Sequence, residues 1–297
     1  VVTLDFASLY PSLIAAFNLC YQTWIDPQQV ARVRQRFPEL EIVEHALELG
    51  QVWEEVRAMP GVVAVYTARD LAALLPGGQR LVTGLPSSSI AFALDRPILP
   101  EHETVYVGEA LAMVVAETRA EAEDAAEMID LDLDPLEPVA DLENAARHDA
   151  PKAHTHLPHN RLARFGFSYG DIAAAFDGAP HVMSRRFRID RGGAHSMEGR
   201  GVLAAPDAMT GRLSVWSSTQ TPHALKRHIC TLLARDDAEV EVTAPDLGGA
   251  FGPKLVTYPE EIAVAAAAQA LGRPVRWVED RREHFLAACQ EREQLWT

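Results

Sequence analysis

The sequence of 297 residues carries 27 lysines and arginines against 42 aspartates and glutamates, so its formal net charge at pH 7 is −15. Hydrophobic residues make up 48% of the chain and charged residues 23%, a balance that excludes an intrinsically disordered protein. The acidic excess disfavours a protein that mainly grips a nucleic-acid backbone, because phosphate binding needs clustered basic side chains. The length predicts two domains with sizeable cores.

Three widely separated cysteines, Cys20, Cys230 and Cys289, form neither a metal-ligand spacing nor a disulfide framework. A reduced, cytoplasmic setting is therefore expected. No apolar run approaches the roughly 20 residues that a membrane span needs, so no membrane partner is expected. The sequence begins at Val1 inside an apolar run and stops at Thr297, and both ends are expected to be cut.

In chain order, the first part of the sequence predicts alternating short strands and helices. Residues 1–4 form an apolar, strand-like run, and Asp70 is expected to cap a short helix that ends at Leu75. The alternation of Ile129 with aspartates and leucines predicts a half-buried strand that completes a β-α-β unit. The other elements expected here are a helix at 46–58, strands at 62–66 and 111–116, and a helix at 119–128.

Prolines at positions 135, 138, 151 and 158 predict a linker, after which strands and helices alternate again. The pattern as a whole indicates an α+β fold. The elements expected after the linker are strands at 181–189, 212–217, 240–244 and 275–278, and helices at 223–233 and 259–271.

A glycine-rich loop at 245–254 follows the predicted strand at 240–244. Its glycines allow positive φ and a close approach of the backbone to a ligand, and successive N–H groups can cradle an anion. The spacing fits neither the Walker loop nor the dinucleotide fingerprint. A tight turn after a buried strand is the alternative interpretation.

A polar segment, Ser217 to His223, stands where a predicted strand meets a predicted helix, a place that suits a cofactor pocket. The alternative is an N-cap made by Thr219 or Thr221, which is the favoured role for one of them. A cap does not need Gln220, whose amide can both donate and accept hydrogen bonds.

Three histidines, His154, His156 and His159, are close enough in sequence to bind a metal ion. No carboxylate or cysteine completes the set. A proline-rich linker that contains histidines is the favoured interpretation.

Many of these motifs occur in one order in a known family. Residues from about 58 to 293 resemble the molybdenum-binding large subunit of the xanthine dehydrogenase, aldehyde oxidase and carbon monoxide dehydrogenase family. The segments that carry the resemblance are 58–68 (AMPGVVAVYTA), 106–112 (YVGEALA), 170–171 with 175–176, 197–201 (MEGRG), 216–220 (WSSTQ), 248–254 (GGAFGPK), 272–275 (GRPV) and 279–281 (EDR).

The resemblance implies a hammerhead-type α/β domain followed by the first half of a molybdopterin-binding domain. It also implies a molybdopterin cofactor and oxidative hydroxylation of an aldehyde or N-heterocycle, or oxidation of carbon monoxide. On matching positions, Gln220 resembles the catalytic-site amide that hydrogen-bonds a molybdenum ligand. Phe251 resembles the loop residue that covers the metal, and the cofactor-binding positions implied are Gly248, Gly249, Ala250, Phe251 and Gly252.

The sequence also departs from the family pattern. The general-base glutamate and the substrate-selecting loops of the family correspond to a segment after Thr297, so this chain is expected to be an inactive fragment. At Gly199 and Pro253 it differs from the commonest pattern. The partners implied are the C-terminal half of the subunit, iron–sulfur and FAD subunits, and a small-molecule substrate.

A second resemblance covers only the first residues. Residues 4–12 (LDFASLYPS) and 18–21 (NLCY) are similar to the first palm motif of family B DNA polymerases. That resemblance implies a catalytic Mg²⁺ bound by Asp5, a carboxylate expected at a strand end, and a sugar site shaped by Tyr10. The net charge of −15 opposes a polymerase, and nucleic acid is not an expected partner.

The two resemblances predict a chimeric chain with a junction near residues 43–58; a natural N-terminal extension is the alternative. The parts expected are a polymerase-palm-like segment at 1–45, the hammerhead-like domain at 46–140, a linker at 141–160 and a partial molybdopterin-binding domain at 161–297. A fragment of a molybdenum hydroxylase is the leading hypothesis for function. A polymerase palm fragment and a non-catalytic binding or assembly module are the alternatives.

Overall fold

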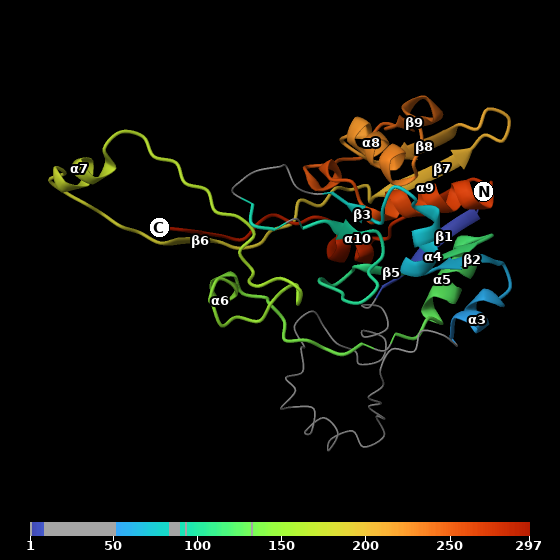
Figure 1. Ribbon diagram of the computed structural model, residues 1–297, viewed down its shortest axis with the longest axis horizontal. Coiled ribbons are helices and arrows are strands. Elements are labelled where there is room, and N and C mark those ends of the chain that lie inside the picture. Colours follow the sequence, from blue (N-terminus) through green and yellow to red (C-terminus); the bar gives the residue numbers. More distant parts are fainter. Residues whose placement is uncertain (1, 9–51, 83–89, 93, 132) are drawn as a thin grey trace, which may run out of the picture.

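A computed structural model describes residues 2–8, 52–82, 90–92, 94–131 and 133–297. Its centre is a mixed seven-stranded sheet in the order β2-β5-β1-β10-β7-β8-β9, with helices packed against it (Figure 1). Strands from both ends of the chain therefore lie in one sheet. The mixture of helices with a largely antiparallel sheet confirms the predicted α+β class.

The elements before the linker are short. They are β1 (Val2–Ser8), α3 (Val52–Arg57), β2 (Val62–Tyr66), α4 (Ala68–Leu74), β3 (Arg80–Leu81), β4 (Arg96–Pro97), β5 (Ala110–Ala116), α5 (Arg119–Glu127) and α6 (Leu142–Ala145).

The later elements include the longest helix of the described part of the chain. They are α7 (Ile172–Asp177), β6 (Phe187–Ile189), β7 (Gly201–Pro206), β8 (Leu213–Ser217), α8 (Pro222–Leu232), the 3-10 turn η1 (Asp237–Glu239), β9 (Val240–Thr243), the 3-10 turn η2 (Pro253–Leu255), α9 (Pro259–Leu271), β10 (Val275–Val278), α10 (Arg281–Ala287) and β11 (Gln294–Trp296).

Strand β1 joins the two sides of the sheet. It runs antiparallel to β5 and parallel to β10, so Thr3 pairs with Ala116 on one side and with Arg276 on the other. Asp5 is the fourth of the seven residues of β1 and pairs with Val114, so it does not stand at the strand end expected for a metal ligand. Tyr10 and the rest of the polymerase-like segment lie outside the described residues.

Helix α9 forms the middle of the main core. Ten of its thirteen residues are buried, most of them alanine, valine or isoleucine. Small side chains let α9 approach the sheet closely, and α4 and α8 pack beside it. The buried cluster around α9 includes Leu71 and Met113 from before the linker, as well as Leu213 and Val275 from after it. One core therefore spans both halves of the sheet.

Several predicted elements are confirmed within a residue or two. The strands at 62–66 and 275–278 and the helix at 259–271 have the predicted bounds. Gly272 ends α9 with a φ of 62°, the left-handed conformation that glycine adopts without strain. The helices predicted at 119–128 and 223–233 are α5 and α8.

Other expectations are wrong. No strand forms in the described residues of 129–134, and hence no β-α-β unit. Ile129 is buried in a second cluster with Val56 and Val65, so its side chain is packed without a hydrogen-bonded ladder. The strand expected at 181–189 is reduced to β6. The helix after β2 is capped by Thr67 rather than Asp70, whose carboxylate instead accepts from the Thr67 N–H to complete a capping box.

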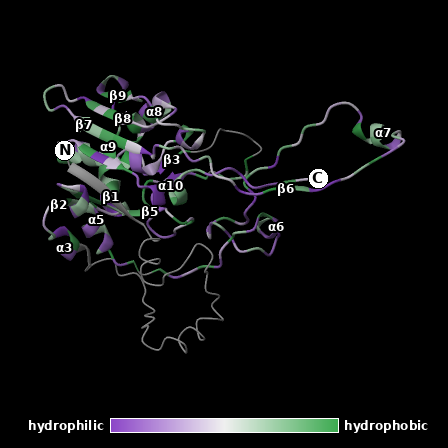
Figure 2. Ribbon diagram, turned by 180° about the vertical axis from the view of Figure 1, so that it is seen from behind, coloured by the Kyte–Doolittle hydropathy of each residue, from purple (hydrophilic) through white to green (hydrophobic). Residues whose placement is uncertain are grey.

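The segment around α7 and β6 projects away from the sheet as a long arm (Figure 1). Its aromatic side chains are strongly exposed: Phe167 is 95% and Tyr169 98% accessible. Figure 2 shows hydrophobic residues on α7 at the far end of this arm. Exposed apolar side chains gathered in one segment are typical of an interaction surface.

Within the part of the chain that the structure describes, no helix has the length and apolar character needed to cross a bilayer.

Candidate functional site

Gln220 and the glycine-rich loop, which lie some 30 residues apart in the sequence, are in contact. The Gln220 side-chain Oε1 accepts a hydrogen bond from the Gly252 N–H at 3.1 Å. The Gln220 N–H donates to the Lys254 carbonyl at 2.8 Å. The structure therefore brings together the two segments that the sequence singled out separately.

The sheet explains this contact. Strands β8 and β9 are parallel neighbours, with Leu213 paired to Val240, so their carboxyl ends lie at the same edge. The Gln220 segment follows β8 and the glycine-rich loop follows β9. Ligand sites of mixed and parallel sheets form at such edges, where loops after neighbouring strands converge.

The hydroxyl groups of the two threonines beside Gln220 contact the glycine-rich loop and do not cap helix α8. Thr221 is the N-cap residue of α8 but makes no side-chain cap, so the predicted capping role is wrong. Its hydroxyl donates to the Leu255 carbonyl at 2.8 Å, and the Thr219 hydroxyl reaches the Lys254 carbonyl at 3.4 Å. The N–H of Ala224 in the first helical turn donates to the Thr221 carbonyl at 3.0 Å and not to a threonine hydroxyl. The Thr219 hydroxyl also accepts from the Thr221 N–H at 3.1 Å.

The loop has an unusual backbone. Phe251 has a φ of 53°, a left-handed conformation that costs a non-glycine residue about 1–2 kcal/mol. Its ring is 72% exposed, so burial does not offset this cost. The ring lies over Gly249, where an added Cβ would meet Phe251 Cε2 at 3.0 Å. An exposed aromatic residue with a strained backbone is typical of a ligand-binding loop.

The residues present fit a cofactor rich in hydrogen-bonding groups. Among the described residues, none accepts a hydrogen bond from the N–H groups of Gly249, Ala250 or Phe251. A Cβ at Gly252, whose φ is 102°, would meet nothing within 4 Å, so this face of the loop is open beside Gln220. Three backbone donors without a partner and the Gln220 amide N–H₂, in two segments that are in contact, can hold the polar edge of a molybdopterin.

An ion pair between Glu198 and Lys254, which the sequence did not predict, contacts the loop. The Glu198 carboxylate accepts from the Gly248 N–H at 2.6 Å and from Lys254 Nζ at 3.1 Å. Lys254 is only 1% exposed, although lysine is rarely buried. The sequence offered one signal for this pair: Glu198 and Lys254 both stand in segments of the family resemblance.

A buried ionic cluster lies next to this pair. The Arg200 guanidinium contacts Glu279 at 2.9 Å and Glu260 at 3.3 Å and stacks on the Tyr258 ring at 4.0 Å. Burial alone would lower the pKa of Arg200, but Glu260 and Glu279 outweigh it and raise that pKa. Gly199 leaves room for Glu279, whose Cγ would lie 3.2 Å from an added Cβ.

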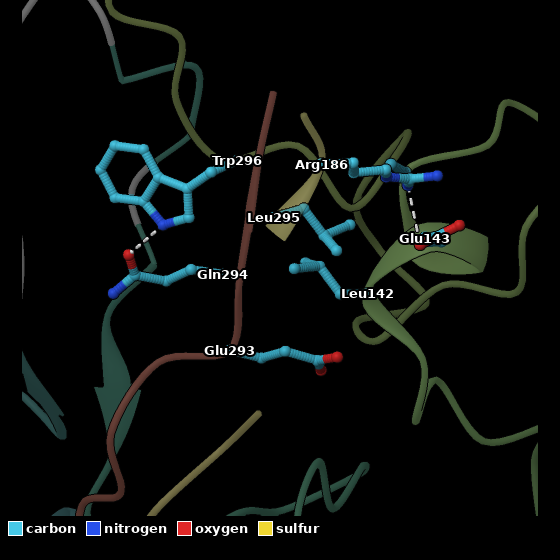
Figure 3. A pocket seen from close by; sticks show the side chains of 8 residues that line it. Leu142, Glu143, Arg186, Glu293, Gln294, Leu295 and Trp296 are labelled. Atoms are coloured by element: carbon cyan, nitrogen blue, oxygen red, sulfur yellow. Dashed lines mark hydrogen bonds and ion pairs between the residues drawn. The ribbon is translucent and has the colours of Figure 1, made fainter. Parts of the chain in front are cut away.

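Two hollows lie along the C-terminal segment instead of at the loop. One, of about 890 Å³, has Arg96, Tyr106 and Cys289 in its lining. The other, of about 670 Å³, lies between α6 and β11, where Arg186 pairs with Glu143 and Trp296 Nε1 donates to Gln294 (Figure 3). Neither lining includes Gln220 or the glycine-rich loop.

The three linker histidines do not form a metal site in the described residues, where no group of three or more metal-ligating side chains comes together. The rings of His154 and His156 are 5.6 Å apart in an edge-to-face contact.

Most of the chain matches domains of known protein families. The molybdopterin cofactor-binding domain matches residues 153–297, and the a/b hammerhead domain of aldehyde oxidase and xanthine dehydrogenase matches residues 51–137. DNA polymerase family B matches residues 1–77, and thus overlaps the hammerhead match at 51–77.

Individual relatives agree with the first two matches. The chain is 38% identical to the nicotine 6-hydroxylase large subunit of Paenarthrobacter nicotinovorans over 85% of its length, and 31% identical to the carbon monoxide dehydrogenase large chain of Hydrogenophaga pseudoflava over 77%. The crystal structure of quinoline 2-oxidoreductase from Pseudomonas putida 86 superposes with a TM-score of 0.75 at 34% identity; the match covers 82% of this chain and 30% of that one.

These matches define the class of protein. The chain belongs to the xanthine dehydrogenase and aldehyde oxidase family and matches a part of its molybdopterin-binding large subunit. It spans about 30% of the length of the curated relatives: 30% of the nicotine 6-hydroxylase large subunit and 29% of the carbon monoxide dehydrogenase large chain.

Proposed function

We propose that the chain is the hammerhead and cofactor-binding part of the large subunit of a molybdenum hydroxylase. The observation that carries the proposal is the contact between Gln220 and the loop 248–252. The Gln220 side-chain Oε1 accepts from the Gly252 N–H, which leaves the amide N–H₂ available near a loop with three unpaired backbone donors. When bound, molybdopterin supplies the redox centre at which an electron-poor carbon is oxidatively hydroxylated. Iron–sulfur and FAD subunits are the partners that this function requires for passing electrons on.

In this proposal each part of the site has one task. Gln220 holds a polar ligand of the metal through its side-chain amide. The N–H groups of Gly249, Ala250 and Phe251 bind the cofactor, and the exposed Phe251 ring excludes water from it. Asp5 has no role in this function.

A nitrogen heteroaromatic ring is the substrate class that we propose. Nicotine and quinoline, named in two similar proteins at 38% and 34% identity, both contain such a ring, whereas similarity to the carbon monoxide dehydrogenase large chains is 30–31%. An aromatic nitrogen withdraws electrons from the neighbouring carbon, which makes that carbon open to oxidation.

Replacing Gln220 by alanine should lower turnover of an N-heterocycle about 10- to 100-fold, because the metal loses a neighbouring hydrogen-bond partner. The measurement is substrate-dependent dye reduction, with molybdenum content, by the chain produced together with the additional part that its longer relatives carry. Gln269→Ala, an exposed glutamine near the end of α9, is the matched control and should keep full activity. Equal activity of the Gln220→Ala variant and the unaltered protein would refute the assigned role.

The 297-residue chain by itself should reduce no dye with any of these substrates. Its arm exposes apolar residues such as Phe167 and Tyr169, which we propose the rest of the subunit covers. The same assay, run on the isolated chain, checks this expectation, and measurable turnover would contradict it.

A further inference from the structure

We infer that Glu198 is a positioning residue that sets the shape of the cofactor loop by joining its two ends. One oxygen of its carboxylate accepts from the Gly248 N–H at 2.6 Å, and the other accepts from Lys254 Nζ at 3.1 Å. Gly248 and Lys254 bound the segment that carries Phe251 and faces Gln220. The inference rests on the proposed function only for what the loop binds.

A backbone hydrogen bond and the close approach at Gly248 show that Glu198 and the start of the loop are fitted to each other. The Glu198 N–H donates to the Gly248 carbonyl at 3.1 Å, so the two residues are joined through backbone and side chain. A Cβ at Gly248 would lie 2.6 Å from Glu198 Cβ, so only glycine allows this approach. The Ser196 hydroxyl donates to the Glu198 carbonyl at 2.5 Å and fixes the segment below the loop.

The bridge that Glu198 makes between Gly248 and Lys254 is buried at its lysine end. Lys254 is 1% exposed, and its ammonium is paired with Glu198, whose side chain is 42% exposed. A buried ammonium is costly without a counter-charge, so Lys254 holds its position only while Glu198 stays in place. The Lys254 carbonyl in turn accepts from the Gln220 N–H. The bridge thereby also fixes the distance between Gln220 and the loop.

The segment that carries Glu198 is itself anchored. Arg281 donates from Nη1 to the Ser196 carbonyl at 2.8 Å and from Nη2 to the Met197 carbonyl at 2.5 Å. Two residues further on, the Arg200 N–H donates to the buried Glu279 carboxylate. The segment that carries Glu198 is therefore held by several hydrogen bonds, as is required of a residue that positions a ligand loop.

The test compares Glu198→Gln with Glu123→Gln, a half-exposed glutamate paired with Arg119 on α5, which makes the same change of charge away from the loop. Glutamine offers a single acceptor oxygen, so it can keep one of the two bonds and turns an amide N–H₂ toward the other donor. The first readout is amide hydrogen exchange of the cofactor-free full chain. Exchange at Gly248, Gly252 and Gln220 should be at least tenfold faster in Glu198→Gln and unchanged in Glu123→Gln, while the α9 amides stay within twofold.

Loop exchange within twofold of the unaltered chain would overturn the inference, as would equal acceleration in α9, which indicates general destabilisation. The second readout is pterin content after production with the rest of the subunit, expected to fall at least fivefold in Glu198→Gln. Unchanged content in spite of a loosened loop would also overturn it. If the unaltered protein holds no pterin, the proposed function fails, and the exchange experiment still decides whether Glu198 shapes the loop.

Discussion

Replacing Arg200 by methionine is expected to lower the free energy of unfolding by about 3–5 kcal/mol, the usual cost of leaving a buried charge without its partner. Arg200 is 4% exposed, and the Glu279 and Glu260 carboxylates that it contacts are buried with it. The substitution also removes the stacking of the guanidinium on Tyr258 at 4.0 Å. Urea unfolding of the cofactor-free chain at constant pH measures the change.

An exposed arginine serves as the control for this loss. Arg212 pairs with Glu241 at 3.1 Å, and both side chains are about half exposed, so Arg212→Met should cost no more than about 1 kcal/mol. The double variant Arg200→Met/Glu279→Gln should lose less than the sum of the two single variants, because their charges compensate each other. Strict additivity, or a loss for Arg200→Met as small as for Arg212→Met, would contradict the assignment of a coupled buried cluster.

The second large effect concerns the pH dependence of stability. Burial raises the pKa of Glu261 to about 7, against the hydrogen bonds from the Ser217 hydroxyl and the Tyr258 N–H, which act in the opposite direction. In the unfolded chain this carboxyl has its ordinary pKa near 4.5. Between these two values the folded chain holds a proton that the unfolded chain has released, so the stability contributed by Glu261 is lost as pH rises.

The size of this effect follows from the shift. At about 1.4 kcal/mol for each pKa unit, Glu261 should remove about 3 kcal/mol of stability between about pH 4.5 and pH 7. Glu261→Gln cannot titrate, and its amide can still donate to Ser217 and accept from Tyr258. The variant should therefore gain stability relative to the unaltered chain as pH rises through this window.

Urea unfolding at a series of pH values checks the expectation, because the difference between the two proteins cancels the contributions of all other titrating groups. Glu241→Gln, on the exposed face of β9, should show no such difference. A difference curve for Glu261→Gln that stays flat from pH 4.5 to 7 would show that this carboxyl is ionised in the folded chain.

The sequence alone predicted the parts of the fold with strong local patterns. Alanine-rich α9 ends at Gly272, and β10 is bounded by Pro274 and an acidic stretch, so both had clear limits. Strand β7 was missed because its glycine and alanines give little β-propensity, and its place comes from pairing with β8 and β10. The strand expected at 129–134 was wrong because the alternation of apolar and acidic residues indicates which side chains are buried. It does not indicate whether the backbone pairs with another strand.

The candidate site was predicted in its parts but not in its connections. Gln220 and the loop 248–252 were identified by motif, and their contact could follow only from the parallel pairing of β8 with β9. The bridge from Glu198 to Lys254 spans 56 residues, and no local pattern links the two. Long-range ionic contacts of this kind depend on tertiary structure, which periodicity and spacing do not report.

The most direct test of the central claim is the stoichiometry of molybdenum and pterin in the chain purified after production with the remaining part of the subunit. We predict about one of each for every chain, and a large loss in Gln220→Ala. A protein that contains neither and instead binds nucleotide with Mg²⁺, in a manner abolished by Asp5→Ala, would contradict the account and support the polymerase resemblance of residues 1–77.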